Sequence, residues 1–180
     1  MSKRRVVILG STGSIGTSAL DVIRKDRSRF EVLGLAVNGN VDLLREQIAE
    51  FSPAYVAVGD ETKAQALAKE LTGTKVMAGE QGVLELAGIE SDVVVVGIVG
   101  LAALKPIIRC LGRTRRMALA NKEAVLAAGE LLMDRVRDSG TELFPVDSEA
   151  WGVYRLLRGV PRENIRKVYI TASGGPFFFA

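Results

Sequence analysis

Short runs of apolar residues alternate with segments of helical periodicity along nearly the whole chain. The short runs are rich in Val and Ile and lack alternating polar positions, which indicates strands that are covered on both faces. Such strands are predicted at residues 5–9, 31–37, 55–58, 75–78, 92–96, 116–119, 142–146 and 167–171. Apolar residues at helical spacing predict helices at residues 14–25, 41–51, 62–71, 101–111 and 123–138. The alternation predicts an α/β fold, a doubly wound Rossmann-type parallel sheet with helices on each side.

The strand and helix series divides the chain into two parts. A Rossmann-like domain is expected over residues 1–145, because no repeat or low-complexity segment interrupts the series there. Residues 146–180, with a short helix at 150–157, are expected to begin a second, incomplete α/β unit. In the helix predicted at 123–138, five apolar residues are expected to share one face. These are Val125, Leu126, Leu131, Leu132 and Val136.

Composition excludes several classes of protein. The 180 residues include one cysteine and no histidine, so an intramolecular disulfide, a Ser-His-Asp triad and a histidine-bearing zinc site are excluded. The lone Cys110 and the lack of about 20 consecutive apolar residues favour a soluble cytoplasmic protein with no membrane partner. Net charge is +3, and acids interrupt each basic cluster, so a solvated surface is favoured over nucleic-acid binding.

The first candidate site is a glycine-rich turn between the first strand and the first helix. It reads Gly10-Ser-Thr-Gly13-Ser-Ile-Gly16, a G-x-x-G-x-x-G spacing. Glycines at such a turn let the backbone approach a pyrophosphate, and the free amides of the helix N-terminus stabilise its charge. An isolated match of this spacing would favour a structural tight turn, but its place in the first βαβ unit favours dinucleotide binding.

The end of the second strand bears on the choice of cofactor. Sites that prefer NAD usually carry an Asp or Glu there, whereas this chain has Asn38-Gly39-Asn40. The absence of a carboxylate permits a 2′-phosphate and favours NADPH, although the turn contains no Arg or Lys. A simple strand-to-helix turn explains the same three residues about as well.

Two further clusters follow later strands, at the edge where open α/β sheets bind ligands. Asn121-Lys122-Glu123 could bind a phosphate or carbonyl through Lys122, or could serve as an N-cap with an acid in the first turn. In Asp147-Ser148-Glu149, extended geometry would point both carboxylates to one side, where they could hold Mg²⁺ or Mn²⁺. A helix N-terminus is again the simpler alternative.

The last cluster, Thr171-Ala-Ser173-Gly-Gly175, suits an oxyanion or phosphate, or an ordinary turn. Three adjacent phenylalanines then precede Ala180, and each would cost about 1.5–3 kcal/mol if left in water instead of buried. We therefore expect the chain to be a truncated part of a longer protein.

Taken together, the order of these clusters resembles the N-terminal part of the 1-deoxy-D-xylulose 5-phosphate reductoisomerase family. The motifs that carry the resemblance are the glycine turn, Leu119-Ala-Asn-Lys-Glu123, Pro145-Val-Asp-Ser-Glu149 and Thr171-Ala-Ser-Gly-Gly-Pro176. The resemblance covers nearly all 180 residues and departs from the family at Ala150 and Trp151, where members usually have His and a small polar residue.

The resemblance implies an NADPH-dependent, Mg²⁺- or Mn²⁺-assisted oxidoreductase of non-mevalonate isoprenoid biosynthesis. It would convert the phosphorylated ketose 1-deoxy-D-xylulose 5-phosphate to 2-C-methyl-D-erythritol 4-phosphate, in a family whose full-length members are typically homodimers. The resemblance implies that the cofactor is bound by the glycine turn (Gly10, Thr12, Gly13, Ser14, Ile15, Gly16), by Asn38, Gly39 and Asn40, and by Asn121 and Glu123. It implies that the substrate is contacted by Lys122, Ser148 and Ser173. It implies that the metal ion is bound by Asp147 and Glu149.

Two alternatives remain at this stage. Another NADP-dependent reductase, of the semialdehyde or dihydrodipicolinate type, would share the glycine turn but not the paired carboxylates. A degenerate or truncated dinucleotide-binding module would bind cofactor without catalysis, and the present chain alone could also be inactive.

Overall fold

A computed structural model describes residues 2–170 of the chain. Backbone contacts divide the chain into two compact units, Met1–Phe144 and Pro145–Ala180. The strands are β1 (Arg4–Leu9), β2 (Phe30–Val37), β3 (Tyr55–Val58), β4 (Lys75–Ala78), β5 (Ser91–Val96), β6 (Thr114–Leu119) and β7 (Glu142–Pro145). The helices are α1 (Ser14–Lys25), α2 (Val41–Phe51), α3 (Glu61–Glu70), α4 (Gly79–Ala87), α5 (Leu104–Cys110), α6 (Lys122–Ser139) and α7 (Ser148–Leu157), with short 3₁₀ segments η1 (Leu101–Ala103) and η2 (Arg162–Asn164).

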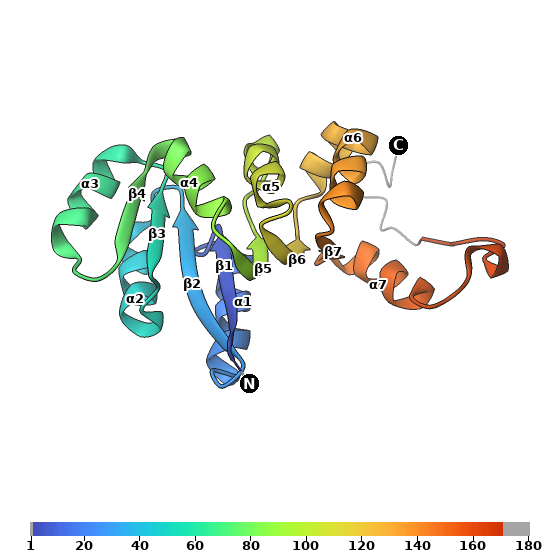
Figure 1. Ribbon diagram of the computed structural model, residues 1–180, viewed down its shortest axis with the longest axis horizontal. Coiled ribbons are helices and arrows are strands. Elements are labelled where there is room, and N and C mark those ends of the chain that lie inside the picture. Colours follow the sequence, from blue (N-terminus) through green and yellow to red (C-terminus); the bar gives the residue numbers. More distant parts are fainter. Residues whose placement is uncertain (1, 171–180) are drawn as a thin grey trace, which may run out of the picture. The chain divides into compact units, whose positions relative to one another are not determined.

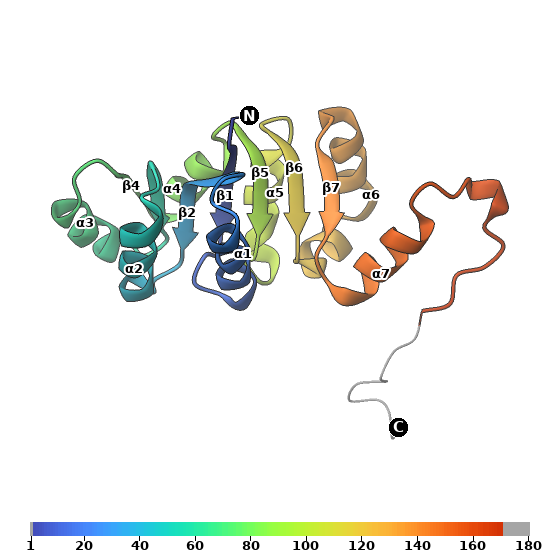
Figure 2. The ribbon, with the colours of Figure 1, turned by 90° about the horizontal axis from the view of Figure 1, so that it is seen from below.

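The first unit is a seven-stranded sheet in the order β4-β3-β2-β1-β5-β6-β7 (Figure 1). All recorded pairings among β1 to β6 are parallel, and Figure 2 shows β7 pointing the same way as β6. The chain moves outward from β1 in one direction and then returns to continue from β5 in the other. This reversal between β1 and β5 is the topological switch point at which doubly wound sheets bind ligands. The predicted α/β fold is therefore confirmed.

Two apolar cores lie on opposite faces of the sheet. Val6 and Ile8 belong to the core beneath α1, α2 and α3, whereas Val7 and Leu9 belong to the core beneath α4, α5 and α6. Successive strand residues point to opposite faces, so the four consecutive apolar residues of β1 are all buried, while Arg4 and Arg5 at its start are exposed. Figure 2 shows α1 and α2 in front of the sheet and α5 and α6 behind it.

The pairing of β1 with β2 contains one irregularity. Val6 pairs with Val32 but Val7 pairs with Gly34, so Leu33 is an additional residue in β2. The bulge shifts the register between the two strands by one residue, and the parallel pairing continues on either side of it. Beyond the bulge, Leu9 pairs with Ala36 next to the glycine turn.

Several elements differ from the sequence prediction. Helix α4 was not predicted, because two glycines in its nine residues weaken its helical signal. The strand predicted at 167–171 is absent over 167–170, and residue 171 lies outside the described residues. Strands need a hydrogen-bonding partner, and the described part of the second unit contains only helical segments beyond Pro145.

The helix predicted at 123–138 is broken at Gly129, and its expected apolar face is only partly correct. Gly129 has φ 51° and ψ −131°, which lies outside the helical region. Leu132 and Val136 are buried as expected, but Leu126 and Leu131 are 80% and 76% exposed. The break changes the direction of the helix, so residues on either side of it cannot form one continuous face.

Two features of the described residues bear on the excluded classes. Among residues 2–170, no helix combines the length and apolar character that crossing a membrane requires. Cys110 is a buried free thiol in the core beneath α5, and desolvation by burial raises its pKa to about 12. A thiol with this pKa is inert at neutral pH, which gives Cys110 a packing role.

An ion-pair cluster joins α1 to α2 and predicts a pH dependence of stability. Arg24 and Arg27 each contact the Glu50 carboxylate, at 2.6 Å and 2.5 Å. The hydrogen bond from Arg24 lowers the pKa of Glu50 below its ordinary value of 4.5. A carboxylate with a lowered folded-state pKa stabilises the protein fully above pH 4.5 and loses this contribution as the pH falls through the folded-state value.

We therefore expect Glu50→Gln to lower the free energy of unfolding at neutral pH and to flatten its fall below pH 4.5. Urea unfolding at a series of pH values measures both effects. Glu46→Gln is the matched control on the same helix, because Glu46 is exposed and in no ion pair among the described residues. Equal acid dependence in the wild type and Glu50→Gln would contradict the assignment.

Candidate functional site

The glycine turn, residues 10–16, is held tightly between the ends of β1, β2 and β5. Gly10 has φ +90°, and a Cβ at this position would lie 2.9 Å from the carbonyl carbon of Gly97. A Cβ at Gly16 would lie 2.3 Å from the carbonyl oxygen of Gly10. These contacts explain two of the three glycines of the motif, because a side chain at either position would force backbone apart.

The backbone amides of this turn fall into two groups. Gly10 and Ser11 both donate to the carbonyl of Ala36 at 2.9 Å, and Gly13 donates to Gly10 at 3.2 Å. Within residues 2–170, no acceptor is found for the amides of Thr12, Ser14, Ile15 and Gly16. Helix α1 also has neither a capping side chain nor an acidic residue in its first turn. The positive end of its dipole is thus uncompensated, and four N–H groups remain for an anion.

A buried hydrogen-bonded pair connects the glycine turn to α2. The Ser11 hydroxyl donates to Oε1 of Gln47 at 2.7 Å, and Nε2 of Gln47 donates to the Ser11 carbonyl at 3.0 Å. Ser11 is 0% and Gln47 5% exposed. Gln47 was not predicted from the sequence, although a glutamine beside Leu44 and Ile48 departs from an otherwise apolar helix face. Both side-chain hydrogen bonds of Gln47 go to Ser11, so Gln47 positions the turn.

Gln47→Leu is expected to destabilise the protein by about 1–3 kcal/mol, because it leaves the Ser11 hydroxyl and carbonyl buried without a partner. Removing the hydroxyl as well, in Ser11→Ala/Gln47→Leu, should recover part of the loss. Chemical denaturation of the two single variants and the double variant measures the coupling. Strictly additive losses would show that the two side chains do not support each other.

The turn after β2 contains the three residues proposed from the sequence to lie near the cofactor ribose. Asn38 is exposed, and its carbonyl accepts from the amide of Asp60 at 2.8 Å. The side chain of Asn40 accepts from the amide of Leu43 at 3.3 Å and so caps α2. The carbonyl of Gly39 accepts from Nζ of Lys63, which lies on α3, at 2.9 Å.

The Asn121 cluster joins the end of β6 to the segment that follows β5. Asn121 is 3% exposed; its Nδ2 donates to the carbonyls of Ile98 and Gly100, and its Oδ1 accepts from the amide of Ala124 at 2.7 Å. The side chain is therefore fully used in capping α6 and in holding residues 98–100. Lys122 and Glu123 are exposed on the first turn of α6.

A cavity of about 610 Å³ lies at the switch point of the sheet, a size typical of small-molecule sites. The ends of three neighbouring strands and the segments around α4 and α5 form its wall. The lining residues are Gly10, Ala36, Val37, Asn38, Gly59, Glu80, Val83, Ile98, Val99, Leu101, Ala102, Lys105 and Pro106. Most of the wall is apolar, and Lys105 and Glu80 form an ion pair of 2.6 Å within it. The structure thus brings Gly10 and Asn38 together on one cavity.

In the second unit, the carboxylate motif begins α7 instead of running in extended form. Asp147 has extended backbone angles, and its Oδ1 accepts from the amide of Ala150 at 2.8 Å. Ser148 and Glu149 are already helical, and Oγ of Ser148 donates to Glu149 at 3.0 Å. The expectation that two extended carboxylates point to one side is therefore wrong. Asp147 serves as the N-cap, which leaves its second oxygen and the exposed Glu149 carboxylate for other partners.

Two further residues of the second unit complete the sequence-based candidates. Trp151 stacks on Tyr154 with ring centroids 5.6 Å apart, so the indole is held along α7. Ser173, expected to contact substrate, lies outside the described residues. Among the described residues, no group of three acidic, cysteine or histidine side chains converges as a metal site.

The parallel sheet, the glycine turn and the free amides at its switch point define a nucleotide-binding domain of the Rossmann class. The family model described as 1-deoxy-D-xylulose 5-phosphate reductoisomerase matches residues 6–129, and the model of that enzyme's C-terminal domain matches residues 143–180. The chain belongs to the 1-deoxy-D-xylulose 5-phosphate reductoisomerase family.

Curated relatives and solved structures agree with this assignment. The reductoisomerase of Thermoanaerobacter pseudethanolicus is 44% identical over 175 residues, and that of Chlorobium phaeovibrioides is 45% identical over 179. Each match covers 97% of this chain and 46% of the relative, so the chain spans about half the length of these proteins.

Among solved structures, the Zymomonas mobilis reductoisomerase in complex with NADPH matches with a TM-score of 0.89 and 35% identity. That match covers 99% of this chain and 48% of the other. A reductoisomerase complex with NADPH, fosmidomycin and magnesium matches with a TM-score of 0.80 and 32% identity, over 84% of this chain and 38% of the other.

Proposed function

We propose that this chain forms the NADPH-binding domain and the beginning of the catalytic domain of a 1-deoxy-D-xylulose 5-phosphate reductoisomerase. The whole enzyme would convert 1-deoxy-D-xylulose 5-phosphate to 2-C-methyl-D-erythritol 4-phosphate in non-mevalonate isoprenoid biosynthesis. The observation that carries this proposal is the set of free amides of Thr12, Ser14, Ile15 and Gly16 at the N-terminus of α1. The solved relative that holds NADPH supports the choice of cofactor.

The role proposed for each cluster of residues follows from its geometry. The amides of the glycine turn would bind the cofactor pyrophosphate, because they combine free donors with an uncompensated helix dipole. The turn at 38–40 would lie beside the adenosine ribose. Lys122, exposed at the start of α6, would attract the phosphate or carbonyl of the substrate, together with Ser148 and Ser173. Asn121 and Glu123 would lie near the cofactor, with Asn121 acting through the backbone of residues 98–100.

Asp147 and Glu149 would hold Mg²⁺ or Mn²⁺. Their donor chemistry fits such an ion, since both offer carboxylate oxygens and one oxygen of Asp147 is free of the capping bond. When bound, the ion would polarise adjacent oxygens of the α-hydroxyketone substrate. The capping bond from Ala150 fixes Asp147 at the start of α7, and Ser148 orients Glu149 through its hydroxyl.

The same proposal includes a homodimeric assembly in the cytoplasm. The exposed Leu126 and Leu131 on either side of the Gly129 break offer apolar surface that association would remove from water. Sedimentation analysis of the chain tests the assembly, with a monomer at all concentrations as the contrary result. The inert, buried Cys110 is compatible with a reducing compartment.

Titration of the 180-residue chain with NADPH and with NADH, followed by cofactor fluorescence, tests the cofactor site. Saturable NADPH binding that is tighter than NADH binding is expected, whereas no binding of either at millimolar concentration would refute the proposal. Mn²⁺ binding tests the second unit separately. Asp147→Asn should weaken Mn²⁺ binding and leave NADPH binding intact, and indifference to Mn²⁺ in the wild type would remove the metal assignment.

A further inference from the structure

The turn at residues 38–40 lacks a feature that the proposed cofactor calls for. A 2′-phosphate is distinguished from a 2′-hydroxyl by its charge, and NADP sites commonly place a cation at the end of the second strand. Asn38, Gly39 and Asn40 carry no charge. Either the site is indifferent to the 2′-phosphate, or a cation reaches the turn from another element.

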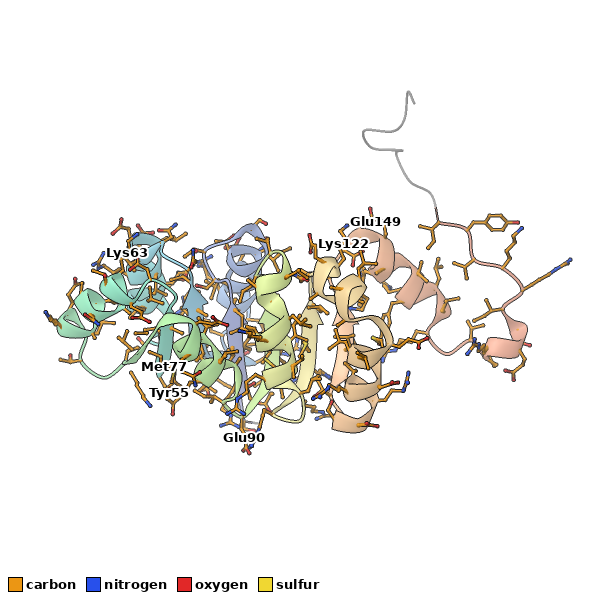
Figure 3. All side chains as sticks on the ribbon, turned by 90° about the horizontal axis from the view of Figure 1, so that it is seen from above. Tyr55, Lys63, Met77, Glu90, Lys122 and Glu149 are labelled. Carbon is orange, nitrogen blue, oxygen red and sulfur yellow. The ribbon has the colours of Figure 1, made fainter. Side chains whose placement is uncertain are left out.

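A cation does reach the turn, from α3. Nζ of Lys63 donates to the carbonyl of Gly39 at 2.9 Å. A Cβ built on Gly39 would lie 3.5 Å from this ammonium and 4.0 Å from Cδ of the same lysine. Lys63 therefore lies at ordinary contact distance from the point where a side chain at Gly39 would begin. Figure 3 shows Lys63 at the sheet edge where the strands end, shared with Lys122 and opposite to Tyr55 and Glu90.

The contact with Gly39 does not neutralise the charge of Lys63. Its hydrogen-bond partner is a neutral carbonyl, and the ion pairs between described residues do not include Lys63. An ammonium has three donors, so two remain for other acceptors. By contrast, Arg45 on α2 is paired with both Asp42 and Glu70. Asp60, at the start of the same helix, uses one carboxylate oxygen to accept from the Lys63 amide at 3.1 Å and thereby caps α3.

The surrounding geometry places this ammonium beside the proposed cofactor. Asn38, which precedes Gly39, and Gly59, which follows β3, both line the cavity at the switch point. We propose that Lys63 binds the 2′-phosphate of NADPH and supplies the cofactor selectivity that the turn at 38–40 lacks. This inference rests on the proposed function and adds to it the residue, on α3, that distinguishes NADPH from NADH.

Two nucleotides that differ only in the 2′-phosphate test the proposal directly. Calorimetric titration of the 180-residue chain with adenosine 2′,5′-bisphosphate and with adenosine 5′-monophosphate gives a ratio of affinities that is independent of turnover. Lys63→Gln should lower this ratio by about 10- to 100-fold, the range for a hydrogen bond between charged groups. Lys63→Arg should retain most of it. Lys69→Gln, an exposed lysine on the same helix, is the matched control and should retain the wild-type ratio.

A second variant separates recognition from support of the turn. Gly39 has no positive φ and its Cβ would make only ordinary contacts, so a side chain there is tolerated. Lys63→Gln/Gly39→Lys should restore preference for the bisphosphate by returning a cation to the same space.

The other possible results contradict either the role of Lys63 or the proposed function. If Lys63→Gln weakens both nucleotides equally, Lys63 only supports the turn and the proposal is overturned. An unchanged ratio overturns it too, while NADPH binding by the wild type leaves the proposed function standing. If the wild type binds neither probe nor NADPH, the proposed function itself fails.

Discussion

Replacement of Gly16 by alanine is expected to weaken NADPH binding by at least about 100-fold and to destabilise the protein by about 3 kcal/mol. The added methyl would lie 2.3 Å from the carbonyl oxygen of Gly10 and 2.5 Å from Cα of Ser11. Both are backbone atoms, so no side-chain rotation can relieve the overlap. The turn would have to move away from α1, which would displace the free amides of Thr12, Ser14 and Ile15.

Gly13→Ala is the matched control for stability. A Cβ at Gly13 would lie 3.5 Å from the carbonyl oxygen of Gly10, which is an ordinary contact, and φ at Gly13 is −80°. Thermal unfolding of the two variants should therefore give a large loss for Gly16→Ala and a small one for Gly13→Ala. Wild-type stability and cofactor affinity in Gly16→Ala would mean that the turn is not packed as described.

Asn121→Ala is expected to cost about 2–4 kcal/mol of stability and to weaken cofactor binding as well. One side chain caps α6 and holds the carbonyls of Ile98 and Gly100. Its loss removes a cap of about 1 kcal/mol. Because Asn121 is only 3% exposed, its loss also leaves the carbonyls of Ile98 and Gly100 without their hydrogen-bond donor. Because Ile98 lines the cavity at the switch point, the damage would extend from the end of the helix to the wall of that cavity.

Asn40→Ala provides the comparison, since Asn40 also caps a helix. That side chain is exposed and makes one bond of 3.3 Å, so its removal should cost less than about 1 kcal/mol. Denaturant unfolding measures both losses. Equal losses for the two asparagines would show that the bonds from Asn121 to residues 98–100 contribute nothing.

Features that depend on residues close in sequence could be predicted, whereas features that depend on contacts between distant residues could not. The strands and the glycine turn were predicted because continuous Val and Ile runs and a G-x-x-G-x-x-G spacing are local signals. The break at Gly129 was not, because a lone glycine in a helical pattern is usually tolerated within the helix. Gly129 has a positive φ, and Leu132 and Val136 beyond it are buried.

The candidate site shows the same division. The residue types at 12–16 and at 121 were identified, whereas the contacts of Gln47 and Lys63 were not. Ser11 and Gln47 are 36 residues apart, and Gly39 and Lys63 are 24 apart. No local pattern reports such pairs, because the sheet order alone brings α2 and α3 to the ends of β1 and β2. Metal binding by the carboxylates at 147 and 149 stays a prediction, and the capping role of Asp147 replaces the extended geometry that the sequence suggested for them.

The additional residue in β2 has a consequence for how the chain tolerates insertions and deletions. Leu35, Ala36 and Val37 keep their faces of the sheet because the surplus residue is absorbed before them, between the partners of Val6 and Val7. Removing Leu33 would leave a regular ladder in which Ala36 still offers its carbonyl to Gly10 and Ser11. The bulge therefore accommodates one extra residue in β2 while Ala36 keeps its pairing with Leu9 and its hydrogen bonds to the glycine turn.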